Sequence, residues 1–160
     1  LELRYQGESM AMLILLPKKP DGLNELERTL SPVRLQSVVA GLRPTQIRVF
    51  LPRFRVESFF ELTKPLSAMG MPDAFDSKHA DFSGINGKRD LYVSAVAHKI
   101  FVEVNEDGAE AAAAAAVVMR TKGATMSAPP VFRADHPFLF IIRDLKTGLI
   151  LFLGRVVDPR

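Results

Sequence analysis

Residues 106–116 read Glu-Asp-Gly-Ala-Glu followed by six consecutive alanines. Alanine has the highest helix propensity, so a helix is one prediction for this stretch. Such a helix would bury little apolar area, and Asp107 is the only residue in front of it suited to capping. A stretch of small side chains can alternatively enter a sheet as an added strand, because small residues obstruct least where neighbouring strands must part. The residues of this stretch leave both structures open.

The regions on either side of this stretch predict β-strands. Residues 91–105 carry apolar side chains on both faces, which predicts a long central strand with a neighbour on each edge. Residues 138–142 and 149–157 predict two further buried strands, joined as a hairpin by a turn at 144–148. Residues 10–16 form a continuous apolar run, which is typical of a strand buried on both faces.

Helices are few and short in the remaining pattern. Apolar spacing predicts helices over 23–30 and 63–70, and a Ser-Pro start predicts another over 31–41. In residues 46–60 the apolar positions change from odd to even at Pro52, which predicts a strand that bends and exchanges faces or leaves one sheet for another. Strands outnumber helices without regular βαβ alternation, so we predict an α+β fold with mostly antiparallel sheets.

Composition limits the class of protein. The chain has 160 residues, 48% hydrophobic and 24% charged, which predicts one folded domain. No apolar run reaches the roughly 18 residues needed to cross a bilayer. The absence of cysteine excludes disulfides, thiolate metal sites and a cysteine nucleophile. A net charge of +3 is too small to indicate nucleic-acid binding, so we expect neither a membrane nor a nucleic acid as partner.

No combination of residues indicates catalysis. His98 lies among apolar residues, which predicts a hydrogen-bonded structural histidine. Asp76, His79 and Asp81 predict a solvated polar loop. In residues 53–56 arginine alternates with apolar residues, typical of a solvated strand face, with an anion- or polysaccharide-binding patch as the alternative. The sequence holds no nucleophile elbow, phosphate-binding loop or dinucleotide motif, so we predict a protein that is not an enzyme and holds no metal or cofactor.

Several motifs together resemble the serpin family of protease inhibitors. The stretch 106–116 resembles the serpin hinge, at which the reactive loop begins after a long central strand. Residues 132–142, FRADHPFLFII, match the C-terminal serpin signature position for position, and residues 151–159, LFLGRVVDP, resemble the last strand. The motifs AVAHK at 95–99 and DAF…ADFSGI at 73–85 are also serpin-like.

The resemblance implies that residues 1–160 are the C-terminal part of a single serpin domain, with the N-terminal part absent. The reactive loop would span about 106–130. His98 would correspond to the shutter histidine of the family, and no cofactor would be required. The resemblance also favours an extracellular or secreted protein.

The implied activity is inhibition of a serine protease by the suicide-substrate mechanism. The protease cuts the loop, and the cut loop inserts into a sheet and traps the acyl-enzyme. Matching the hinge motif residue by residue assigns the hinge to Glu106, Gly108, Ala109, Glu110, Ala111, Ala112, Ala113 and Ala114. Small hinge residues favour inhibition over a binding, carrier or chaperone role.

The family spacing places the reactive bond between Lys122 and Gly123, with Arg120 and Thr121 as the second choice. A lysine or arginine before the reactive bond suits a trypsin-like protease, because its charge pairs with an aspartate in the specificity pocket of that protease. Counting backwards from Pro137 gives Met126 instead. A non-inhibitory serpin or an inactive truncated fragment remains the alternative, and unpaired sheet edges would favour self-association.

Overall fold

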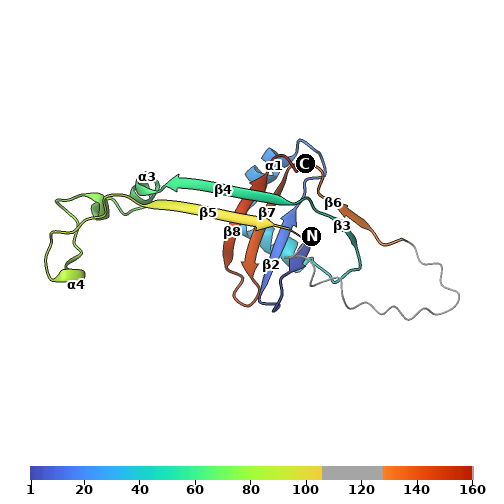
Figure 1. The fold of residues 1–160 in the computed structure, drawn as a ribbon, viewed down its shortest axis with the longest axis horizontal. Coiled ribbons are helices and arrows are strands. Elements are labelled where there is room, and N and C mark those ends of the chain that lie inside the picture. The colour runs from blue at the N-terminus through green and yellow to red at the C-terminus, as the bar shows by residue number, and fades with distance from the viewer. Residues whose placement is uncertain (106–127, 160) are drawn as a thin grey trace. The chain divides into compact units, whose positions relative to one another are not determined.

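The computed structural model describes residues 1–105 and 128–159, and the chain divides into two compact units. The first unit is Leu1–Phe54 with Glu103–Arg160, and the second is Arg55–Val102. Figure 1 shows the elements of both. The sheets are mostly antiparallel and the helices short, which confirms the predicted α+β class.

The first unit is built on a four-stranded antiparallel sheet in the order β1-β2-β7-β8. Its strands are β1 (Glu2–Arg4), β2 (Met10–Leu15), β7 (Phe138–Asp144) and β8 (Ile150–Val156). The two central strands, β2 and β7, are buried over most of their length, as their continuous apolar runs predict. The hairpin of β7 and β8 is likewise confirmed.

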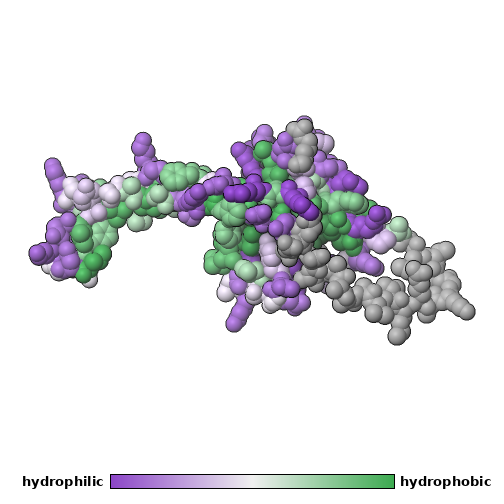
Figure 2. Space-filling view, in the orientation of Figure 1, coloured by the Kyte–Doolittle hydropathy of each residue, from purple (hydrophilic) through white to green (hydrophobic). Residues whose placement is uncertain are grey.

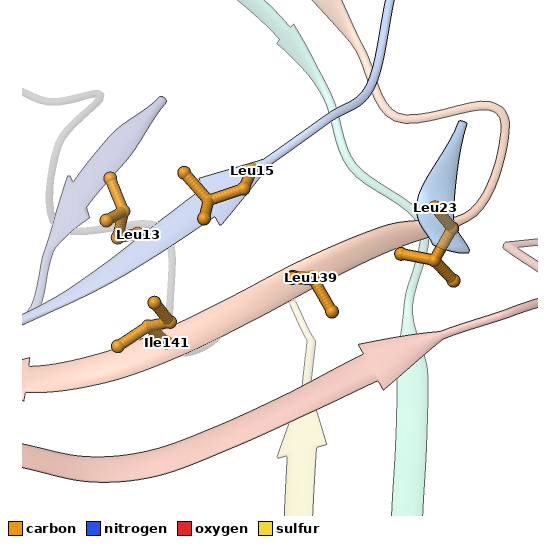
Figure 3. Packing of buried hydrophobic residues seen from close by; sticks show 5 residues of the cluster. All are labelled: Leu13, Leu15, Leu23, Leu139 and Ile141. Atoms are coloured by element: carbon orange, nitrogen blue, oxygen red, sulfur yellow. The ribbon is translucent and has the colours of Figure 1, made fainter. Parts of the chain in front are cut away.

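Two helices cover one face of this sheet. They are α1 (Leu23–Thr29) and α2 (Pro32–Ala40), close to the predicted ranges, and the Oγ of Ser31 caps α2 by accepting from the backbone N–H of Arg34 at 3.2 Å. Figure 3 shows the core beneath α1, formed by Leu13, Leu15, Leu23, Leu139 and Ile141. Leu13 pairs with Ile141 and Leu15 with Leu139, so the register brings the odd-numbered side chains together under the helices.

Aromatic side chains fill the opposite face. Phe138 and Phe140 of β7 are fully buried there. The ring of Phe54 packs against both, with centroid distances of 5.8 Å to Phe138 and 5.3 Å to Phe140. Apolar residues on both faces therefore hold β7 in the interior.

We expect Gly154→Ala to destabilise the first unit. Gly154 is the register partner of Phe140, and a Cβ added to it would lie 2.5 Å from Phe140 Cζ. The ring already packs against Phe54, so overpacking should lower the free energy of unfolding by about 1–3 kcal/mol. Urea unfolding of Gly84→Ala is the control, because no atom lies within 4 Å of a Cβ at Gly84. Equal unfolding midpoints for both variants would contradict the prediction.

The parity change at Pro52 separates two strands that belong to different sheets, which is the second of the two predicted alternatives. Before it, β3 (Arg48–Phe50) pairs in parallel with β6 (Val131–Arg133). After it, β4 (Phe54–Glu61) pairs with β5 (Ala97–Val104). Proline has no N–H to donate to a ladder, which suits a junction between sheets.

The second unit contains most of the β4–β5 pair and three short helical segments. These are α3 (Thr63–Ala68), η1 (Asp73–Phe75) and α4 (Ser83–Asn86). On the β4–β5 pair, Glu57 forms an ion pair with Lys99 at 2.5 Å, and Arg55 lies over the ring of Phe101. Arg55 is exposed, in keeping with the predicted solvated strand face. Among the described residues, no helix has the length and apolarity that a membrane span requires.

Two strands differ from the sequence prediction. β5 starts at Ala97, six residues later than predicted, and within the described part of the chain it has a single neighbour, β4. β8 was expected to be buried, but as an edge strand it leaves Leu153 59% exposed, and Figure 2 shows apolar surface where β8 lies in Figure 1. In both cases the apolar pattern is correct, but no other described element covers the face.

Candidate functional site

The predicted hinge and reactive bond lie within residues 106–127, outside the described residues. The structure describes the two points at which this segment is attached. Its N-terminal end follows Asn105, directly after β5, and its C-terminal end leads through Ala128–Pro130 into β6.

The N-terminal attachment is a strand with one paired edge. At the start of β5, Leu62 N–H donates to the carbonyl of Val96 at 2.8 Å, and Val96 N–H donates to Thr63 Oγ1 at 3.1 Å. From there β5 pairs with β4 along one edge, and no strand of the described ranges pairs with the other edge. Val102 is buried whereas Phe101 is 48% exposed, so one face of β5 is covered near its C-terminal end. This edge could accept a further strand.

The C-terminal attachment is the parallel pair of β6 with β3. Backbone hydrogen bonds bracket it: Arg48 N–H donates to the carbonyl of Pro130, and Ala134 N–H to the carbonyl of Phe50, both at 2.9 Å. Parallel register places Arg133 opposite Phe50. The Arg133 guanidinium carbon lies 4.0 Å from the centre of the Phe50 ring, and that of Arg48 lies 5.7 Å away.

Sequence analysis did not identify this cluster of arginine and phenylalanine. Arg48 and Phe50 are two residues apart in the predicted strand, so the sequence predicts that their side chains lie on the same face. The contribution of Arg133 could not be predicted, because it depends on pairing between residues 83 positions apart, Arg48 with Val131 (131 − 48) and Phe50 with Arg133 (133 − 50).

His136 makes hydrogen bonds to two other described residues, a role that the sequence analysis predicted for His98. The ring of His136 contacts the carbonyl of Pro17 through Nε2 at 2.7 Å and the carboxylate of Asp135 through Nδ1 at 2.8 Å. Carbonyl and carboxylate oxygens only accept, so both ring nitrogens carry a proton in this arrangement. The Pro17 carbonyl and then the Asp135 carboxylate raise the pKa of His136 above its usual value.

The hydrogen-bonded role predicted for His98 stays a prediction. His98 is exposed on β5, and no hydrogen bond joins its ring to another described residue. His98 lies on the same face of β5 as the buried Val102, but this face is covered at Val102 and not at His98. The shutter role suggested by the resemblance stays a prediction.

We expect His136→Gln to destabilise the protein more at pH 5.5 than at pH 8.5. The pKa of His136 is raised in the folded state, so its stabilisation is complete below the unfolded pKa, about 6.5, and is lost as the pH rises through the folded pKa. One hydrogen bond from a charged, partly exposed donor contributes about 1 kcal/mol. Chemical unfolding at both pH values measures the difference. His79→Gln measures the same kind of effect at an exposed histidine, because its hydrogen bond with Asp76 also raises the pKa of His79, and the pH-dependent cost there should be smaller. An equal cost of His136→Gln at the two pH values would contradict the prediction.

The remaining polar candidates form the predicted solvated loop. Asp76 accepts from the backbone N–H of Lys78 at 2.8 Å and contacts His79 at 2.6 Å, and these partners lower the pKa of the Asp76 carboxyl. Asp81 accepts from Ser83 and pairs with Arg89. All these side chains are exposed or half-buried, and no group of three or more metal-ligating residues forms within the described ranges.

A small cavity lies beneath the end of β5. Its volume is about 40 Å³, and its lining includes Tyr5, Leu51 and Val104. Such a space holds one or two water molecules and is too small for a peptide or a metabolite. Burial raises the pKa of Tyr5. No ligand site is therefore assigned to this cavity.

The comparisons with known proteins decide the family. A family model described as "Serpin (serine protease inhibitor)" matches residues 1–159. The chain belongs to the serpin family. Among its relatives, "Intracellular coagulation inhibitor 1" of Tachypleus tridentatus is 43% identical over 98% of this chain and 37% of its own length. "Leukocyte elastase inhibitor" of Xenopus laevis is 42% identical over 99% of this chain and 42% of its own length.

A solved serpin structure has the same fold. The crystal structure of uncleaved ovalbumin superposes with a TM-score of 0.80 at 35% identity, and the match covers 99% of this chain and 39% of that chain. This serpin chain thus spans about two fifths of the length of the relatives it matches.

The names of these serpins correct one expectation. We expected an extracellular or secreted protein, but the relative from Tachypleus tridentatus is named an intracellular inhibitor. The expectation of secretion is therefore wrong. The family is one of protease inhibitors rather than enzymes, in agreement with the absence of catalytic motifs.

Proposed function

We propose that the protein inhibits serine proteases as a suicide substrate. In this proposal residues 1–160 are the C-terminal part of one serpin domain, and residues from about 106 to 130 are its reactive loop. The observation that carries the proposal is the position of the small-residue stretch in a serpin chain. It directly follows β5, and β5 has one hydrogen-bonded neighbour among the described residues.

The proposed reaction begins as ordinary proteolysis. The nucleophile of the protease attacks the scissile carbonyl and forms an acyl-enzyme. The cleaved segment then enters the sheet beside β5 and carries the protease with it before the acyl bond is hydrolysed. A segment that returns directly after β5 runs antiparallel to it and pairs with its unused N–H and C=O groups. The uncut state is kinetically rather than thermodynamically stable, so the free energy released on insertion supplies the driving force.

The hinge of this loop is assigned to Glu106, Gly108 and residues 109–114. Their small side chains suit entry between strands. We assign the reactive bond to Lys122–Gly123, with Arg120–Thr121 as the second choice, and the target to a trypsin-like protease. The names of the relatives support a protease partner in general, and they include an elastase inhibitor.

The test is a reaction with trypsin, using both the 160-residue chain and the longest gene product that contains it. A denaturing gel and the mass of the released peptide are measured. We expect a covalent complex with trypsin and the peptide Gly123–Arg160. Complete cleavage without a covalent complex, for trypsin and for an elastase, would contradict inhibition and favour a non-inhibitory serpin.

A further inference from the structure

A cationic patch formed by Arg48, Phe50 and Arg133 lies where the loop re-enters the fold. Arg48 and Phe50 are two residues apart on β3, and Arg133 of β6 is the register partner of Phe50, so all three side chains lie on one face of this strand pair. Phe50 is 39% exposed, and both arginines are exposed. We call these three residues the Arg-Phe-Arg patch.

The ring of Phe50 orients the two guanidinium groups. Their central carbons lie 4.0 Å (Arg133) and 5.7 Å (Arg48) from its centre. A guanidinium over an aromatic face keeps its N–H edges available for bidentate contact with a carboxylate. The aromatic contact also restricts side chains that would otherwise lose much rotamer freedom on binding.

Neither arginine of the patch has an acidic partner within the described residues. No carboxylate there lies within 4.0 Å of either guanidinium. The charge of Arg133 helps to lower the pKa of Asp135, but the carboxylate of Asp135 forms its hydrogen bond with His136. Among the described residues, the patch therefore presents two exposed guanidinium groups that form no ion pair with a carboxylate.

We propose that the Arg-Phe-Arg patch is an exosite, a secondary contact surface that binds carboxylates on the protease engaged by the loop. This inference rests on the proposed function. β6 continues the loop, and residues 123–130 can span at most about 28 Å even when fully extended. A specific interface covers on the order of 800 Å² of each partner, so a protease bound at Lys122–Gly123 can reach the face of β6 when residues 123–130 are not fully extended. A protease that carries acidic residues beside its specificity pocket would bind the patch.

The test measures binding of trypsin whose catalytic serine is replaced by alanine, so that encounter is separated from trapping. An anionic and a cationic trypsin are compared, because they share the specificity pocket and differ in surface charge. The variant is Arg48→Gln with Arg133→Gln. The control is Arg28→Gln with Arg34→Gln, which removes two exposed arginines from α1 and α2 and changes the net charge equally.

We expect the patch variant to bind inactive anionic trypsin at least about fivefold more weakly at low salt, with the difference shrinking at high salt. Binding of cationic trypsin should change less, and the control variant should bind both as the parent does. Equal affinities of patch and control variants for anionic trypsin would overturn the exosite. So would a parent that binds neither trypsin.

Two further outcomes distinguish the exosite from a polyanion-binding surface and from the trapping mechanism. If the patch variant loses only its retention on a sulfated polysaccharide and keeps its affinity for trypsin, the patch binds polyanions and the inference is wrong. If active trypsin cleaves every variant without a covalent complex while the fivefold difference in binding persists, the exosite stands and the trapping mechanism fails. Thermal unfolding of both double variants confirms that folding is unchanged.

Discussion

Arginine at both Ala111 and Ala113 is expected to convert the inhibitor into a substrate of its protease. In an inserted strand, alternate side chains face the core and the solvent. Glu110, the only charged residue between Ala109 and Met119, marks the solvent face, so odd-numbered residues of the hinge face the core. Burying an unpaired arginine costs several kcal/mol, so insertion should slow by at least about 100-fold. The measurement is the number of inhibitor molecules consumed per protease molecule inactivated.

The matched control places the same two arginines at Ala112 and Ala114. These side chains share the parity of Glu110 and should remain in solvent, so covalent complex formation should stay close to that of the parent. If the two double variants form covalent complex equally well, the effect of a hinge substitution does not depend on which face of an inserted strand the side chain occupies. If both are still efficient inhibitors, insertion of this segment is not the trapping step.

Replacing Lys122 with leucine is expected to reduce the rate of trypsin inhibition by about 10²–10³-fold. The ammonium group would pair with the buried aspartate of a trypsin-like pocket, and leaving that carboxylate unpaired costs several kcal/mol. The second-order rate constant of inhibition measures the loss, and the mass of the C-terminal peptide identifies the bond that is cut.

Arg120→Leu is the control for this experiment, because it removes an equal charge two residues away. We expect it to leave the rate within a few-fold of the parent. If Arg120→Leu greatly reduced the rate of inhibition and Lys122→Leu did not, the residue bound in the specificity pocket would be Arg120. If neither variant lowered the rate of inhibition and the chain were cut after Met126, a basic residue at the scissile bond would be excluded.

Local pattern was sufficient to predict the strands at the centre of the first unit. The apolar runs that became β2 and β7 are long enough and apolar enough to require cover on both faces, and both received it. The parity change at Pro52 was equally informative, because a one-residue shift in alternation turns every following side chain to the other face. β3 and β4 accordingly pair with different strands.

Burial and long-range contacts were not predictable in this way. The apolar patterns of residues 91–105 and of β8 show that both faces of these strands are suited to burial. Neither pattern identifies the element that would cover those faces. His136 binds a carbonyl 119 residues away, which no local spacing encodes. The Arg-Phe-Arg patch likewise depends on a parallel strand pairing. For the candidate site, the position of the loop and the resemblance to a family were predicted from the sequence. The pairing of the strands that attach the loop came from the structure.

Cleavage anywhere in residues 106–127 leaves β6, β7 and β8 on the C-terminal product. β7 lies between β2 and β8 in the four-stranded sheet, and its buried residues Phe138, Phe140 and Ile141 form much of the core. The two products of a nick are therefore complementary halves of one hydrophobic interior, each unable to bury its apolar surface without the other. A nicked molecule should migrate as a single particle on a native sizing column and come apart only when denatured.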